Sequence, residues 1–319
     1  MGTSTLAAPS VLTHQQRALI RTLLYFDVFQ HPLRENEIYR YLSGSSDKHI
    51  QLSEDLGVLC SEDTISHTAG FYGFGDLTTS IASRELDNQR ARERMGKAER
   101  MSRLIGRFPF VRAVMLSGSI SKGRMAEDGD IDYFVITEPG RLWIARTLLI
   151  VFKKIFLLNS HRDFCVNYFV DTDHLAIQDR NQFTATEVMT LIPTWNRPVC
   201  RAFFAANGWA KEMLPNMELP FATDIPSENG GLKKLVEALL RSRLADEIDE
   251  WCMLRTLKHW RTKFTEFDRA QFDIALRTRK YVSKHHPRNF QGIVLDAYQK
   301  KIDRFEQQHG LSLSTENPA

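Results

Sequence analysis

Two short polar groups in the middle of the chain have the residue types and spacing for phosphate and metal chemistry. The first is Ser117-Gly118-Ser119, and the second is the carboxylate pair Asp130 and Asp132. Glycine lets a backbone come close to a ligand, and serine offers a hydroxyl and an N–H group to a phosphate. Two neighbouring carboxylates repel each other unless a cation lies between them, and hard oxygen ligands suit Mg2+. Together these groups predict a site for a phosphate and a metal ion.

Two apolar runs flank these groups and are predicted to be β-strands. Residues 111–116 end at the Ser-Gly-Ser turn, and residues 130–136 begin with the carboxylate pair. Alternate residues of a strand point to the same face, so both carboxylates are predicted to share one face. Ser119 is predicted either to cap a following helix or to give its hydroxyl and N–H to a phosphate at the positive end of that helix.

A metal beside a phosphate-binding turn is suited to nucleotidyl transfer, in which cations neutralise the leaving pyrophosphate. The spacing of Gly118-Ser119, ten further residues and the Asp130, Asp132 pair at an apolar strand resembles the signature of the DNA-polymerase-β-like nucleotidyltransferase superfamily. The resemblance covers roughly residues 100–175. It implies a small mixed sheet with flanking helices, Mg2+ or Mn2+ on the two aspartates, and Gly118 and Ser119 around the triphosphate of a nucleotide.

Basic residues and a third carboxylate complete the predicted site. Lys122 and Arg124 follow the turn closely, where they would reach either triphosphate oxygens or solvent. The superfamily usually carries a third carboxylate on a later strand, predicted here over residues 164–170. Asp163, Asn167 and Asp171 share one face of that strand by alternation, but the two acids are about 26 Å apart, so only one reaches the site.

We assign the third catalytic carboxylate to Asp171 and keep two alternatives. Asp163 is one, and Asn167 as a neutral ligand is the other, which would weaken the transferase interpretation. Farther along, the Thr184-Ala-Thr-Glu187 stretch is a capping-box pattern that predicts the start of a helix, with Glu187 as a cap rather than a ligand.

The composition is that of an ordinary globular protein, with 43% hydrophobic and 25% charged residues. Its net charge of +3 is too small to argue for nucleic-acid binding by itself. The four cysteines lack metal-ligand spacing and are expected to be reduced, which favours a cytoplasmic location. The most apolar segment, residues 142–158, contains Arg146, Lys153 and Lys154, so no membrane span or membrane partner is predicted.

Residues 1–79 are predicted to form an N-terminal domain that resembles a winged helix-turn-helix. Its expected elements are three helices and then two short strands, at residues 14–29, 34–42, 45–56 and 64–74. DNA binding has weak support, because the segment that would enter the major groove holds Lys48 against Asp47, Glu54 and Asp55. Packing or docking of a partner is the other interpretation.

The remainder is predicted to hold a nucleotidyltransferase core at residues 80–210, a linker at 211–231 and an all-α domain at 232–319. The core begins with a long polar helix over residues 80–106. Residues 251–288 contain ten Lys or Arg against three acids. Those cations would hold a triphosphate or a polyanionic acceptor, or they would form a solvated face. The second interpretation expects a buried stripe made of Trp251, Leu254, Leu257, Trp260, Phe264 and Phe267.

The sequence as a whole predicts an α/β (α+β) protein that is a Mg2+-dependent nucleotidyltransferase. It would transfer a nucleoside monophosphate from a nucleoside triphosphate (NTP) to an acceptor that the sequence leaves open among a protein, a small molecule and RNA. The alternative is a catalytically inactive regulator or nucleotide sensor with the same fold, which binds a partner or nucleic acid through its winged-helix-like domain.

Overall fold

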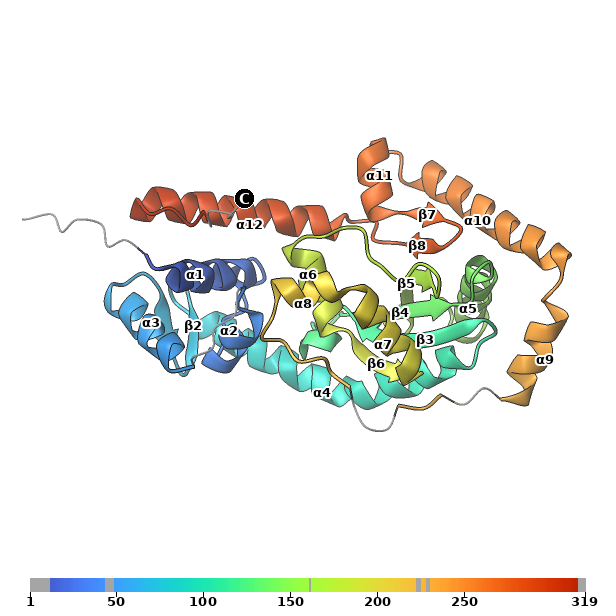
Figure 1. Ribbon diagram of the computed structural model, residues 1–319, viewed down its shortest axis with the longest axis horizontal. Coiled ribbons are helices and arrows are strands. Elements are labelled where there is room, and N and C mark those ends of the chain that lie inside the picture. The colour runs from blue at the N-terminus through green and yellow to red at the C-terminus, as the bar shows by residue number, and fades with distance from the viewer. Residues whose placement is uncertain (1–11, 44–48, 161, 222–224, 228–229, 315–319) are drawn as a thin grey trace, which may run out of the picture. The chain divides into compact units, whose positions relative to one another are not determined.

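The computed structural model describes residues 12–43, 49–160, 162–221, 225–227 and 230–314 (Figure 1). It shows a mixed α/β protein with a two-stranded sheet, a six-stranded sheet and helices around them. The chain divides into two compact units. The first consists of segments 1–85, 211–218 and 292–319, and the second of segments 86–210 and 219–291.

The first unit begins with the predicted order of three helices and a hairpin, which is confirmed. Its elements are α1 (His14–Asp27), α2 (Glu35–Tyr41), α3 (His49–Ser61), β1 (Ser66–Thr68) and β2 (Phe71–Gly73). Thr13 starts α1 with a capping box, because its hydroxyl accepts a hydrogen bond from the N–H of Gln16 at 3.1 Å. The hairpin turns through Ala69 and Gly70, both with positive φ.

The C-terminal helix α12 (Phe290–His309) contributes most of its length to the first unit. The ring of Tyr298 packs edge to face on Tyr25 of α1, with centroids 5.5 Å apart. Lys301 of α12 also pairs with Asp27. The predicted domain of residues 232–319 is therefore wrong as a single body, because its last helix packs with the N-terminal helices.

The second unit is built on a six-stranded mixed sheet in the order β6-β3-β4-β5-β8-β7. The pair β4 and β5 is parallel and all other neighbours are antiparallel. The strands are β3 (Val111–Ser117), β4 (Asp132–Thr137), β5 (Cys165–Asp171), β6 (Ile192–Trp195), β7 (Thr278–Arg279) and β8 (Val282–Lys284).

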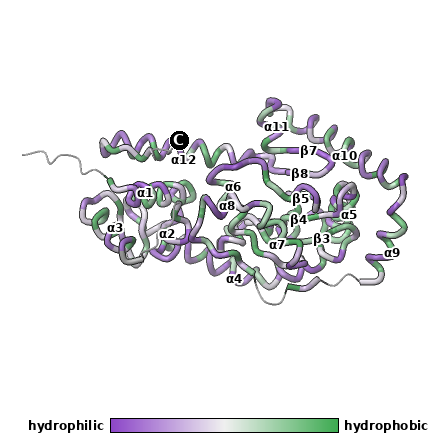
Figure 2. Tube along the Cα trace, in the orientation of Figure 1, coloured by the Kyte–Doolittle hydropathy of each residue, from purple (hydrophilic) through white to green (hydrophobic). Residues whose placement is uncertain are grey.

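Helices cover both faces of this sheet. The helices of this unit are α5 (Leu142–Phe156), α6 (Gln182–Thr190), α7 (Arg197–Ala206), α9 (Gly231–Leu239), α10 (Arg243–Lys263) and α11 (Arg269–Ala275), together with parts of α4 (Thr78–Gly106) and α8 (Gly208–Met213), which the unit boundary crosses. Tyr133 and Val135 belong to one buried core with Ala98 of α4 and Leu149 of α5. The hydrophobic residues of the central strands and α5 stand out in green in Figure 2.

The opposite face of the sheet is closed by aromatic packing. Phe134 lies 4.9 Å from Phe203 of α7 and 5.0 Å from Tyr168 of β5, measured between ring centroids. Since residues 133 and 134 point to opposite faces, β4 is buried along both sides. A strand buried in this way holds its first residue, Asp132, in a fixed position.

One prediction for the C-terminal region is wrong, and one of its two interpretations is met only in part. The region is not all-α, because Val282, Ser283 and Lys284 pair with β5 and extend the sheet. The run was too short for a period-2 pattern to be recognised in the sequence. The stripe predicted to be buried is only partly so: Trp260 is 3% exposed, but Trp251 is 59% exposed.

The orientation of α10 has a local cause. Its buried face carries Ala245, Asp249 and Cys252, and Asp249 accepts a hydrogen bond from the N–H of Ile144 at 2.8 Å. This bond satisfies a free N–H in the first turn of α5 and turns Trp251 outward. In the described part of the chain, no helix has the length and apolar character needed to cross a bilayer.

Candidate functional site

Some of the predicted site residues meet at one edge of the six-stranded sheet, whereas Asp171 and Arg124 do not. Ser117 is paired with Asp132 across β3 and β4, and Asp132 is paired with Cys165 across β4 and β5. The end of β3 and the starts of β4 and β5 therefore lie side by side. The pairing shifts after Tyr133, and this bulge leaves Asn167 as an extra residue of β5 near the same edge.

Gly118 lies directly against the carboxylate of Asp132. It has a positive φ of 67°, and a Cβ placed on it would be 2.2 Å from Asp132 Oδ2. No side chain fits in that space, and the left-handed backbone is unfavourable for other residues. The turn after β3 therefore requires glycine for two reasons, its conformation and its approach to Asp132.

The loop after Gly118 places a lysine over the turn. Its helical part is a single 3-10 turn, η1 (Ile120–Lys122), rather than a longer helix, and Ser119 makes no side-chain cap. The predicted role of Ser119 as a helix cap is therefore wrong. Lys122 Nζ donates to the carbonyl oxygen of Gly118 at 3.0 Å and lies 2.8 Å from Glu187 Oε1.

Glu187 is a site residue that sequence reasoning missed. The prediction that it caps α6 is wrong, because Asn181 is the cap and accepts a hydrogen bond from the N–H of Thr184 at 2.9 Å. The helix starts three residues earlier than the Thr-Ala-Thr-Glu pattern indicates, because its cap is Asn181 instead of Thr184. Glu187 consequently points from the helix body to Lys122. Only the three-dimensional contact between α6 and the loop reveals this position.

Asp132 is a strongly perturbed carboxyl group. Burial raises its pKa to about 7, against a lowering effect of a hydrogen bond from the Cys165 thiol. The negative charges of Asp130 and Glu187 raise it further, and Lys122 lowers it. A buried carboxyl with two acidic neighbours favours a bound cation, because a cation removes the repulsion between them.

The donors at this edge fit Mg2+. That ion is commonly held by one or two carboxylates together with water and substrate phosphates, and Asp130 and Asp132 supply two. Asn167 adds an amide, whose Nδ2 donates to Asp132 Oδ1 at 2.7 Å. Among the described residues, no cluster of three or more His, Cys, Asp or Glu could hold a metal ion.

Backbone contacts fix Asp130 even though it precedes β4. The N–H of Ile131 donates to the carbonyl oxygen of Arg162 at 3.0 Å, which continues the pairing with the segment before β5. Arg94 of α4 donates to the carbonyl oxygens of Gly129 and Arg162 at 2.6 and 2.7 Å. The long polar helix thus holds both segments that carry the site.

The structure does not bring Asp171 to this edge, and its assignment as the third carboxylate is wrong. Asp171 is paired with Thr137, five residues along β4 from Asp132, or about 17 Å away. It is buried there beside His174, with 2.8 Å between Oδ1 and Nδ1. The parallel register of β4 and β5 places Asn167, rather than either acid, next to Asp132.

Asp163 and Arg124 serve the scaffold. Burial disfavours ionisation of Asp163, but hydrogen bonds from Lys97 and Arg94 outweigh it and hold its pKa below the usual range. Arg124 lies 3.7 Å from Asp87 of α4. Of the two basic residues predicted to bind phosphate, Lys122 contacts the glycine turn, whereas Arg124 faces α4.

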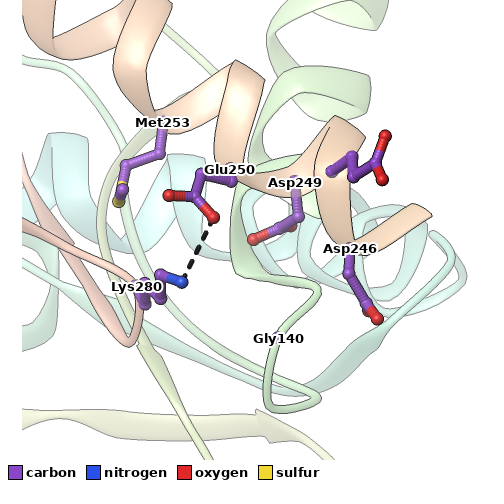
Figure 3. A pocket seen from close by; sticks show the side chains of 7 residues that line it. Gly140, Asp246, Asp249, Glu250, Met253 and Lys280 are labelled. Atoms are coloured by element: carbon purple, nitrogen blue, oxygen red, sulfur yellow. Dashed lines mark hydrogen bonds and ion pairs between the residues drawn. The ribbon is translucent and has the colours of Figure 1, made fainter. Parts of the chain in front are cut away.

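A separate cavity of about 300 Å3 lies between the loop before α5, helix α10 and the turn after β7 (Figure 3). Four acids and one lysine are among the lining residues, which are Gly140, Asp246, Glu247, Asp249, Glu250, Met253 and Lys280. Three of the acids have partners: Asp246 pairs with Arg141, Asp249 caps α5, and Glu250 lies 3.2 Å from Lys280. These contacts indicate that the three acids hold α10 against α5, the loop before α5 and the turn after β7.

Comparisons with protein-family models, with curated proteins and with solved structures found no match to this chain.

Proposed function

We propose that this protein is a Mg2+-dependent nucleotidyltransferase that moves a nucleoside monophosphate from an NTP to an acceptor. One observation carries the proposal: the glycine turn after β3 lies against the buried carboxylate of Asp132, with Lys122 over the turn. This places a turn with close backbone access, a cation and a metal-ligating carboxylate at one sheet edge. A nucleoside triphosphate with its metal requires those three features.

In this proposal Asp130 and Asp132 hold the metal ion and keep it beside the turn. When bound, Mg2+ supplies the charge that stabilises the triphosphate oxygens and the leaving pyrophosphate. Gly118 and Ser119 offer the turn to the phosphates, and Lys122 exchanges Glu187 for a phosphate oxygen. An oxygen of the acceptor forms a bond to the α-phosphorus, the bond from that phosphorus to the bridging oxygen breaks, and pyrophosphate leaves with the electron pair.

The wider assignment follows the same proposal. The second unit would contain the nucleotidyltransferase core, and the helices and hairpin of residues 14–73 would form the winged-helix-like domain. The basic C-terminal segment, of which residues 282–284 pair with β5, would face the acceptor. The protein would act in the cytoplasm, with an NTP as substrate and a protein, a small molecule or RNA as acceptor.

The test is incubation of the pure protein with each α-labelled NTP and Mg2+ or Mn2+, following pyrophosphate release and label transfer. Asp130→Asn with Asp132→Asn is the matched variant, because amides keep the shape of both side chains and remove their charge. Release that depends on the aspartates supports the enzyme and identifies its base preference. Equal turnover by the wild type and the double variant would refute the site.

A second candidate is an inactive nucleotidyltransferase fold that senses nucleotide or docks a partner. Asn167 favours it, because an amide stands near Asp132 where the superfamily resemblance implies a third carboxylate. A sensor would bind NTP with saturation but release no pyrophosphate in the presence of any tested acceptor. Salt-sensitive binding of duplex DNA that survives the double substitution would indicate a regulatory role for the winged-helix-like domain.

A further inference from the structure

Arg146 is a buried cation that none of the structural roles above requires. It lies on α5, is 9% exposed, and makes no hydrogen bond or ion pair within the described chain. Its guanidinium instead lies between two indoles, 5.5 Å from the ring centroid of Trp143 and 4.9 Å from that of Trp260. Burial lowers its pKa to about 10, so the group remains charged at neutral pH.

Aromatic faces alone do not balance such a charge. Cation–π contacts offset only part of what a guanidinium loses when it leaves water, and buried charges are normally paired. Other positive groups surround the same place. Arg146, Lys153 and Lys263 all act on the ring of His285, and burial together with these cations lowers its pKa to about 3. The positive potential around Arg146 favours an anion at this place.

Residues from α5, from α10 and from the segment after β8 surround the guanidinium of Arg146. α5 packs against α10 (Figure 1), and α10 supplies Trp260 and Lys263. The His285 ring lies 4.8 Å from the ring of Trp260, measured between centroids. The two indoles hold the plane of the guanidinium, which leaves its edge for ligands. A guanidinium with a fixed plane binds phosphate or carboxylate through two parallel hydrogen bonds.

We propose that Arg146, with His285, forms a binding site for a phosphate group of a ligand. Phosphate suits this site better than a carboxylate because it carries up to two charges and three acceptor oxygens, matching several donors. At neutral pH the imidazole of His285 is uncharged and donates one N–H, while Arg146 supplies the charge. The site combines residues from α5, from α10 and from the segment after β8.

The proposed phosphate site borders the candidate metal site without overlapping it. The N–H of His285 donates to the carbonyl oxygen of Asn167 at 2.8 Å. Lys153 lies within electrostatic reach of Arg146, Cys165 and Asp130. We therefore assign the phosphate to the acceptor substrate. This last assignment rests on the proposed function, whereas binding of phosphate at Arg146 does not.

The test is titration of the full chain with inorganic phosphate and with pyrophosphate, without nucleotide or metal, by calorimetry and by tryptophan fluorescence. We expect saturable binding by the wild type, a loss of at least tenfold in affinity in Arg146→Met, and a change below twofold in Lys154→Met. Lys154 is an exposed lysine of the same helix and controls for the loss of one charge. If Arg146→Met does not fold, Arg146→Lys keeps the charge and should still weaken binding, because it loses the two-pronged contact.

Further measurements separate this proposal from the proposed function. Phosphate should bind to the Asp130→Asn, Asp132→Asn double variant as it does to the wild type, whether or not the protein transfers nucleotides. Absence of phosphate and pyrophosphate binding in the wild type, or equal affinity in Arg146→Met, would overturn the proposal. A third titration uses acetate. If acetate binds as tightly as phosphate, and its binding is lost in Arg146→Met, the ligand is a carboxylate and the phosphate assignment is refuted.

Discussion

Asn167 donates a side-chain hydrogen bond of 2.7 Å to Oδ1 of Asp132, across the bulge between β4 and β5. The bond joins Asn167, the extra residue of β5, to Asp132, the first residue of the neighbouring strand β4. It supplies a neutral donor to a carboxyl group whose other neighbours include Asp130 and Glu187. An amide at this point limits the negative charge of the site and makes the folded state less dependent on a metal ion.

Asn167→Asp should make folding dependent on divalent cations. A third carboxylate beside Asp132 removes the donor and adds like-charge repulsion, so the melting temperature in EDTA should fall below that of the wild type by several degrees. Mg2+ should restore it, because a ligand that binds only the folded state stabilises that state. Asn167→Ala is the control, since it loses the hydrogen bond and adds no charge. An equal response of both variants to Mg2+ would contradict this role of position 167.

Gly118→Ala should abolish activity and destabilise the protein. The new Cβ would lie 2.2 Å from Asp132 Oδ2, so the carboxylate must move away from the turn. Gly123→Ala is the matched control, because Gly123 has nearly the same φ of 69° but nothing within 4 Å of an added Cβ. Gly123→Ala should lower the free energy of unfolding only by the cost of a left-handed backbone at a residue with a Cβ, about 1–2 kcal/mol. Urea unfolding and label transfer measure both effects, and equal losses in the two variants would disprove the contact.

Asp132→Asn should separate activity from stability. The variant removes a buried carboxyl whose ionisation is disfavoured by burial, so the fold should be kept or stabilised in the absence of metal. Nucleotidyl transfer should fall by several powers of ten, since the reaction depends on charge stabilisation at the metal. Thermal melting and α-labelled NTP turnover give the two readouts. Loss of folding together with activity would show that Asp132 has a structural role instead.

Local patterns predicted the elements and the glycine–aspartate pair, because these depend on short-range features. Residues 14–27 follow a helical apolar period, and the two strands of the signature are continuous apolar runs. Gly118 and Asp132 were recognisable since strand ends, turns and a two-residue spacing are visible in the sequence. The structure places them in contact by pairing Ser117 with Asp132.

Features that depend on register and on distant segments were beyond prediction. Alternation within one strand favours Asp171 over Asn167, because it contains no information on a bulge or on a parallel register. The Thr-Ala-Thr-Glu pattern is local and predicts a cap at Glu187, whereas the contact of Glu187 with Lys122 spans 65 residues of sequence. The two short strands near residue 280 had no pattern of their own, and only pairing with β5 defines them.

Glu187→Gln should tighten nucleotide binding. In the wild type a phosphate must displace Glu187 from Lys122, which lie 2.8 Å apart. Partly exposed ion pairs contribute about 0.2–1 kcal/mol, so the affinity for an NTP without Mg2+ should rise up to about fivefold. Lys122→Met should weaken binding in the same assay. Unchanged affinity in both variants, measured by calorimetry, would remove Lys122 from the phosphate site.

Asp249→Asn should change the pH dependence of stability. Burial raises the pKa of Asp249 to about 6, although hydrogen bonds from the N–H groups of Ile144 and Trp143 lower it. The pKa of Asp249 is higher in the folded state than in the unfolded state, so the protonated carboxyl is the form that the fold favours. Its contribution to stability is fully present below about pH 4 and is lost as the pH rises through about 6. The amide oxygen of asparagine still accepts the N–H of Ile144 and carries no charge.

The variant and the wild type should therefore have similar stability near pH 4. Above pH 6, Asp249→Asn should be the more stable, on the order of 2 kcal/mol. Urea unfolding between pH 4 and 8 measures this difference. Glu250→Gln is the control, because Glu250 is exposed and should change stability by less than about 0.5 kcal/mol at every pH. A wild-type protein that gains stability relative to Asp249→Asn as the pH rises would show that the ionised carboxylate, through its bonds to α5, is the favoured form.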